Sequence, residues 1–165
     1  MIAALLKGIG ACSKLGAYLS AFSMIVIVTL IVVEIICRSL FGVSTMVSDE
    51  FSGYLMVTTV MAGLGYTLEA DSHIRITILL VKLGPRVRSF MDLLATCFAI
   101  VLTLFICYHA ALMVYDSYSY DMRADSISET LIYLPQLVVP LGLVGLILQL
   151  LGLLLRRCRS CSPTP

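Results

Sequence analysis

The chain has 165 residues, of which 60% are hydrophobic and only 13% are charged, and its mean hydropathy is +1.04. A soluble domain has roughly 25% charged residues, so this chain cannot cover a water-facing surface and requires lipid as its solvent. The formal net charge of +1 excludes bulk attraction to nucleic acid or to anionic substrates. The length is that of one domain, so we expect a single membrane domain over residues 1–165.

Four segments are apolar enough to cross a bilayer, which requires about 20 mostly apolar residues in a helix. The predicted spans are residues 15–37, 51–68, 89–115 and 130–155. In lipid, a helix is the only local structure that satisfies all its backbone groups within one segment. The sequence therefore predicts an all-α membrane protein with four transmembrane helices, the first of which is an uncleaved anchor.

The distribution of lysine and arginine predicts the orientation of these spans. If the N-terminus lies in the cytoplasm, nine of the 11 basic residues fall on the inner side of the membrane. This is the distribution that the positive-inside rule describes. Only Arg38 and Arg123 then lie on the outer side. We therefore expect a multi-pass protein with both termini in the cytoplasm.

The segment between the second and third spans, residues 73–84, is too short to cross the membrane and too apolar for a free loop. At helical spacing Arg75 and Lys82 share one face and His73 lies on another, with apolar residues between them. This pattern favours a short helix at the inner membrane interface. An extended stretch is the alternative, because residues 73–78 also alternate between apolar and polar.

Two outer features have both a structural and a functional interpretation. Glu34 and Arg38 are four residues apart near the outer end of the first span, so they share a helix face. A charge at the centre of the bilayer costs at least about 3 kcal/mol on insertion scales, and pairing lowers that cost. The pair either anchors the helix end or places Arg38 against a partner subunit. Residues 116–129, rich in Asp and Ser, form either a solvated connection or a docking surface for an external partner.

Small residues and prolines mark two of the predicted spans. Gly63 and Gly65 lie in the second span, where small residues allow close contact between helices in lipid. Pro135 falls in the first turns of the fourth span, where proline is tolerated, and Pro140 is expected to kink that helix. These residues serve either packing within the chain or contact with a partner.

Signatures of an enzyme are absent from the sequence. It contains no GK[ST] phosphate loop, no G-x-S-x-G elbow and no H-E-x-x-H motif. His73 and His109 lie at different depths, so they cannot share one haem iron. There is also no inverted repeat with paired broken helices, the usual construction of an autonomous secondary transporter. We expect no catalytic, cofactor-binding or metal-binding residues, and a subunit rather than a complete machine.

The chain resembles the small integral membrane subunit, of the DctQ type, of tripartite ATP-independent periplasmic (TRAP) transporters. The resemblance rests on four segments in order: EIICRSLFG, VSDEFSGYLMV, AGLGYTLEADSHIRI and LIYLPQLVVPLGL. Their order, together with four spans, is more specific than any one of them. One position departs from the family pattern, because Thr77 stands where an aspartate is often found.

The resemblance implies a transporter of three components in a bacterial inner membrane. A periplasmic binding protein would capture an organic acid anion, and a large multi-span subunit would carry it inward by symport, commonly with sodium. This chain would be the small permease subunit that scaffolds the large one. Carboxylates, sugar acids and sulfonates are all open as cargo. Two alternatives remain open: a small anchor subunit of another membrane complex, such as a respiratory assembly, and a membrane-embedded enzyme that acts on lipid. The candidates for partner contact are Glu34, Arg38, Asp49, Glu50, Gly63, Gly65, His73, Arg75, Pro135 and Pro140.

Overall fold

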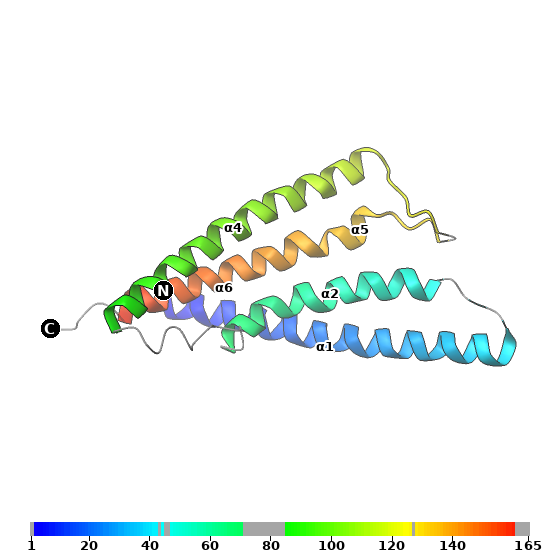
Figure 1. The fold of residues 1–165 in the computed structure, drawn as a ribbon, viewed down its shortest axis with the longest axis horizontal. Coiled ribbons are helices and arrows are strands. Elements are labelled where there is room, and N and C mark those ends of the chain that lie inside the picture. The colour runs from blue at the N-terminus through cyan, green and yellow to red at the C-terminus, as the bar shows by residue number, and fades with distance from the viewer. Residues whose placement is uncertain (1, 43, 45–46, 71–84, 127, 161–165) are drawn as a thin grey trace.

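The computed structural model describes residues 2–42, 44, 47–70, 85–126 and 128–160 (Figure 1). These residues form five helices: α1 (Ile2–Phe41), α2 (Val47–Glu69), α4 (Pro85–Ser119), α5 (Tyr133–Gln136) and α6 (Val138–Ser160). Within these ranges there is no β-strand, and extended pairing is limited to an isolated antiparallel bridge between Arg123 and Leu131. The predicted all-helical fold is therefore confirmed.

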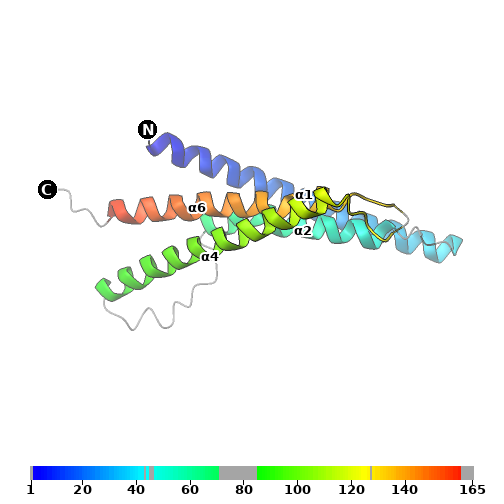
Figure 2. The same cartoon turned by 90° about the horizontal axis from the view of Figure 1, so that it is seen from above.

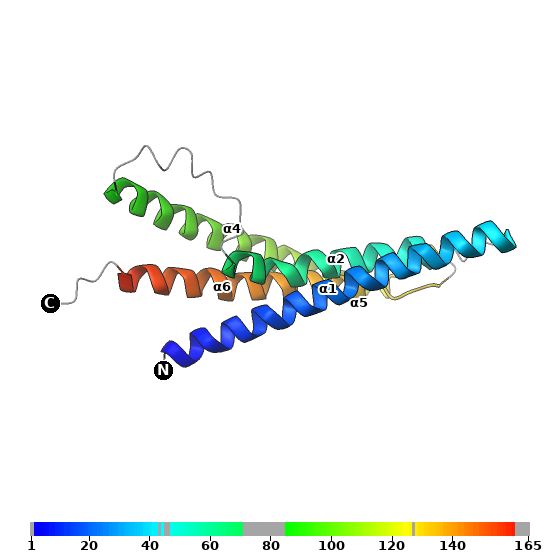
Figure 3. The same ribbon diagram turned by 90° about the horizontal axis from the view of Figure 1, so that it is seen from below.

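The four long helices form an open row (Figure 1). α1 packs against α2, α2 against α6, and α6 against α4, and α1 makes a smaller contact with α6. α4 therefore lies at one edge of the row, with α6 and α5 as its main neighbours. α1 begins and α6 ends at the same end of the molecule, which we call the terminal end (Figures 2 and 3). The opposite end, where α1 and α4 finish, is called the loop end.

Apolar side chains cover the outside of the row rather than its interior. Phe22, Phe98 and Phe105 are each more than 60% exposed. Hydroxyl side chains such as Ser23 and Thr103 are buried instead. Among the described residues the buried hydrophobic side chains are Leu68, Ala110, Leu143 and Leu150. Exposed apolar area on this scale marks an interaction surface in water, whereas in a bilayer it is the surface that contacts the acyl chains.

Three helical stretches of the described residues are long and apolar enough to cross a membrane: Gly8–Phe41, Phe90–Ser119 and Tyr133–Leu155, the last of which comprises α5 and most of α6. α2 is not among them, although its 23 residues extend about 34 Å at 1.5 Å per residue. That length exceeds the roughly 30 Å of the hydrocarbon core, so polarity rather than length distinguishes α2. Much of this polarity is satisfied within the helix, because Thr58 and Thr59 each donate a hydrogen bond at 2.9 Å to the carbonyl four residues earlier.

The fourth predicted span, residues 130–155, begins later in the structure, and its helix is interrupted only at Leu137, whose φ of −56° and ψ of −26° stay helical. Thr130 belongs to the preceding connection, where its carbonyl accepts a hydrogen bond from the Ala124 amide at 2.9 Å. α5 then ends at Gln136 and α6 begins at Val138. Pro140 explains this interruption, because proline has no N–H to donate to the carbonyl four residues earlier.

One further predicted element has different bounds in the structure, and another lies outside the described residues. α1 is a continuous helix of 40 residues and is therefore much longer than the predicted span of residues 15–37. The predicted interfacial helix over residues 73–84, which includes His73 and Arg75, lies outside the described residues.

Candidate functional site

An ion pair lies at the loop end of α1. Arg38 Nη2 is 3.2 Å from Glu34 Oε1, and both side chains bind the same serine. The Ser44 hydroxyl donates to Glu34 Oε1 at 2.7 Å and accepts from Arg38 Nη2 at 3.0 Å. The Glu34 side chain is only 11% exposed, whereas the Arg38 side chain is 63% exposed. The buried carboxylate is therefore compensated within the chain, while much of the guanidinium remains accessible to a partner.

A hollow of about 510 Å³ adjoins this ion pair between α1 and α2. Ile31 and Ile35 supply apolar side chains to its lining, and Ser48, Asp49 and Ser52 supply polar ones from the first turns of α2. Ser48 is buried and Asp49 is exposed. This loop-end hollow therefore offers apolar contact, hydroxyl groups and charges of both signs within one surface.

The Glu50 side chain points away from the hollow that its neighbour Asp49 lines, and it contacts a different part of the molecule. Its carboxylate accepts hydrogen bonds from the hydroxyls of Ser126 and Ser128 in the connection between α4 and α5. The Tyr54 hydroxyl, one helical turn away, donates to the same carboxylate at 2.8 Å. The hydrogen bonds from Ser126, then Ser128, then Tyr54 lower the pKa of Glu50 from 4.5 to about 2, because donors to the ionised form stabilise it.

The connection that supplies these serines is an ordered hairpin, formed by residues 121–126 and 128–131. Backbone hydrogen bonds across the Arg123–Leu131 bridge close it. The Arg123 guanidinium lies 3.4 Å from the Asp121 carboxylate and 3.9 Å from the Glu129 carboxylate. Asp121 and Glu129 both have positive φ values, 45° and 44°, which turn the chain at the two sides of the hairpin.

Close backbone approaches join α1 and α6 to α2. A Cβ atom added at Gly142 would lie 2.6 Å from the Met61 Cβ and 2.8 Å from the Met61 carbonyl oxygen. A Cβ added at Gly16 would overlap the carbonyl oxygen of Ala62. Only glycine allows the helices to come this close, which is the role of small residues in helix contacts within lipid.

The two glycines predicted from the second span lie in these same contacts. A Cβ at Gly63 would be 3.2 Å from the Ser20 hydroxyl oxygen, and Ser20 itself donates to the Thr59 carbonyl at 2.7 Å. A Cβ at Gly65 would be 3.7 Å from the Gln149 Cγ. Gly63 therefore lies against α1, whereas Gly65 lies against α6 and, at 3.9 Å from the Ser13 hydroxyl oxygen, against α1 as well.

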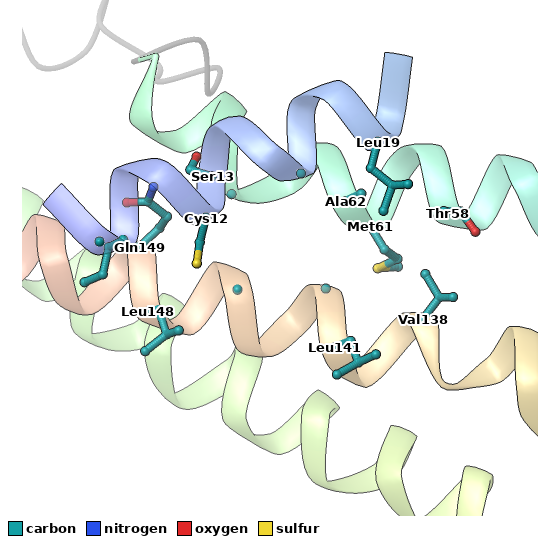
Figure 4. A pocket seen from close by; sticks show the side chains of 16 residues that line it. Cys12, Ser13, Leu19, Thr58, Met61, Ala62, Val138, Leu141, Leu148 and Gln149 are labelled. Carbon is teal, nitrogen blue, oxygen red and sulfur yellow. The ribbon is translucent and has the colours of Figure 1, made fainter. Parts of the chain in front are cut away.

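An apolar groove of about 560 Å³ lies where α1, α2 and α6 meet. Figure 4 shows Cys12 and Leu19 of α1, Met61 of α2 and Leu141 of α6 around it. A hydrated anion cannot enter such a lining without losing hydrogen bonds that the groove does not replace. The groove suits hydrocarbon chains or apolar side chains instead.

The structure divides the predicted site residues into separate groups. Glu34, Arg38, Asp49 and Glu50 gather at the loop end, Gly63 and Gly65 lie in helix contacts, and Pro135 and Pro140 lie in α5 and α6. The carbonyl of Pro140 is 3.9 Å from the Cys107 sulfur of α4, a weak hydrogen bond. His73 and Arg75 lie outside the described residues.

Sequence reasoning missed several residues that the structure brings into these clusters. Gly16 had a visible signal, because Gly8, Cys12, Gly16 and Ser20 form a small-residue face at intervals of four. Ser126 and Ser128 had none, since they lie 76 and 78 residues from Glu50 in the chain.

The comparison with known families decides what kind of protein this is. The family model of the tripartite ATP-independent periplasmic transporters, DctQ component, matches residues 27–160. The chain belongs to the DctQ family. This DctQ protein is 23% identical over 121 residues to a Haemophilus influenzae protein whose name describes it as a TRAP transporter small permease. That alignment covers 73% of each chain.

The family membership confirms the resemblance that the sequence motifs indicated. Members of the DctQ family are components of transporters, and the family is not one of enzymes. Together with the three apolar helices, it identifies this DctQ protein as a multi-pass protein of the inner membrane.

Proposed function

We propose that this DctQ protein is the small permease subunit that scaffolds the large membrane subunit of a TRAP transporter, without selecting or moving the cargo itself. The family match over residues 27–160 carries this proposal. The cargo is an organic acid anion taken up by symport with an ion, which we propose to be sodium. A periplasmic binding protein delivers the cargo to the assembled complex.

Two cavities in the described part of the chain support a scaffolding role. An anion leaving water needs several donors to replace its hydration. The groove between α1, α2 and α6 is apolar, and the loop-end hollow contains one arginine, Arg38, beside two carboxylates. Neither surface is suited to bind a hydrated anion, so the binding groups for the cargo belong to the other components.

We propose that α2 also crosses the membrane, as the second of four spans along the chain. The loop end then lies in the periplasm. In Figure 1, α2 runs back along α1, a helix with a membrane-crossing segment. The hydroxyls of Thr58 and Thr59 are bonded to backbone carbonyls of α2, which reduces the cost of placing them in lipid. The excess of basic residues in the sequence toward the other end supports this orientation.

The large subunit contacts the loop-end hollow in this proposal. Arg38 is paired with Glu34 and yet largely exposed, and Asp49 lies exposed beside it. A partner helix with a carboxylate or a polar side chain can bind the free part of the guanidinium while its apolar side chains contact Ile31 and Ile35. The hairpin, which carries exposed acidic side chains, is the proposed contact for the binding protein.

Uptake into proteoliposomes under a sodium gradient tests the scaffolding role. With binding protein and an organic acid anion outside, vesicles containing this chain alone should take up nothing, and addition of the large subunit should produce uptake. Exchange of this chain for a DctQ protein from a system with another cargo should leave the substrate preference unchanged in hybrids that assemble. Uptake by this chain alone, or a preference that follows it, would refute the proposal.

A further inference from the structure

One contact at the loop end crosses the open row of helices. The hairpin is covalently continuous with α4 and α5, and α4 packs mainly on α6 and α5. Yet Ser126 and Ser128 of the hairpin bind Glu50, which lies at the start of α2. This contact therefore joins the connection of the edge helix to the other side of the row, where α2 packs on α1.

The two oxygens of the Glu50 carboxylate are used differently. Oε1 accepts the hydrogen bond from Tyr54, which fixes the carboxylate on its own helix. Oε2 accepts the two serine hydroxyls. Ser128 is also within 2.9 Å of the Ser126 and Thr130 hydroxyl oxygens, so the hydroxyls of the hairpin form a connected network. Hydrogen bonds to an ionised acceptor are stronger than those between neutral groups.

We propose that Glu50 is a positioning residue that holds the hairpin against the start of α2. Through this Glu50–serine contact, the hairpin keeps a fixed place relative to α1 and α2 and does not move with α4 alone. The hairpin then presents the exposed side chains of Asp121, Asp125 and Glu129, together with Arg123, as a rigid surface of net negative charge. This inference concerns the conformation of the isolated chain, so it stands or falls independently of the proposed transport function.

Distances between spin labels test the contact in the full-length chain in lipid nanodiscs. The six native cysteines are replaced, and labels are attached at Gly53→Cys in α2 and Asp125→Cys in the hairpin. Gly53 is suitable because a Cβ there meets nothing within 4 Å. The parent should give a narrow distance distribution. Glu50→Ala should broaden it and shift it to longer distances, whereas the matched control Asp49→Asn should not.

A second pair of variants separates loss of the contact from damage to α2. Ser126→Ala combined with Ser128→Ala removes the two donors and leaves α2 unchanged, so it should broaden the distribution as Glu50→Ala does. Glu50→Gln retains one acceptor oxygen and should give an intermediate width. Thermal unfolding should stay close to that of the parent in the serine variant, because the helix contacts remain. An unchanged distribution in the serine variant, or equal broadening by Asp49→Asn, would overturn the proposal.

Discussion

Two glycines in α6 allow the cost of close helix packing to be measured against a matched control. A Cβ at Gly142 would lie 2.6 Å from the Met61 Cβ, whereas a Cβ at Gly145 would meet nothing within 4 Å. Ordinary contacts between carbon atoms are about 3.5–4.0 Å, so α6 and α2 would have to separate by roughly 1 Å to accept alanine at Gly142. The Met61 carbonyl, at 2.8 Å from the same Cβ, belongs to the backbone and cannot rotate away.

Two contributions determine how much the alanine substitutions change the stability of the folded chain. Replacement of a helical glycine by alanine gains roughly 0.5–1 kcal/mol, and this gain is common to both positions. Overpacking costs typically about 1–3 kcal/mol and applies only at Gly142. We therefore expect Gly142→Ala to be less stable than Gly145→Ala by about 1–3 kcal/mol.

Unfolding of the purified chain in mixed micelles by increasing mole fractions of SDS, followed by circular dichroism, measures this difference. Gly145→Ala should unfold at the same SDS fraction as the parent or at a higher one, and Gly142→Ala should unfold at a lower SDS fraction than Gly145→Ala. Equal stability of the two variants would refute the inference that glycine at position 142 sets the distance between α2 and α6.

Three further predictions concern the loop end and the orientation of the chain in the membrane. The hydrogen-bonded carboxylate of Glu50 has a pKa of about 2, so Glu50 should stabilise the hairpin fully above pH 4.5 and lose that contribution only as the pH falls toward 2. An infrared titration of the carboxylate band, assigned with Glu50→Gln, would contradict this if Glu50 became protonated near pH 4.5. Arg38→Ala should reduce recovery of the large subunit with this chain while Glu34→Gln has a smaller effect, since Arg38 is the exposed member of the pair; unchanged recovery and uptake would make the arginine an anchor alone. Single cysteines at Ser119 and Ser89, in a cysteine-free background, should react with an impermeant thiol reagent in intact cells at 119 and not at 89, and labelling of both positions would contradict the proposed orientation.

Several features of the fold could be predicted from the sequence because they depend on local composition. The apolar segments in α1, α4 and α6 correspond to three of the predicted spans. They could be predicted because the free energy of transfer into lipid is roughly the sum of the contributions of the individual residues. The four-residue spacing of Glu34 and Arg38 predicted a shared helix face, and the structure pairs them at 3.2 Å. The four segments that carry the family resemblance are likewise local stretches of sequence, and they overlap the range of residues 27–160 that the family model matches.

The arrangement of the helices depended on the tertiary structure. Hydropathy does not distinguish the face of a membrane helix that contacts lipid from the face that contacts another helix, because both environments are apolar. The row with α4 at its edge, and the approach of Gly142 to Met61, are therefore invisible in the composition of the spans. The contact of Glu50 with Ser126 and Ser128 joins residues more than seventy positions apart. It forms only because folding brings the start of α2 beside a connection that is polar in the sequence but shows no sign there of a partner within the chain.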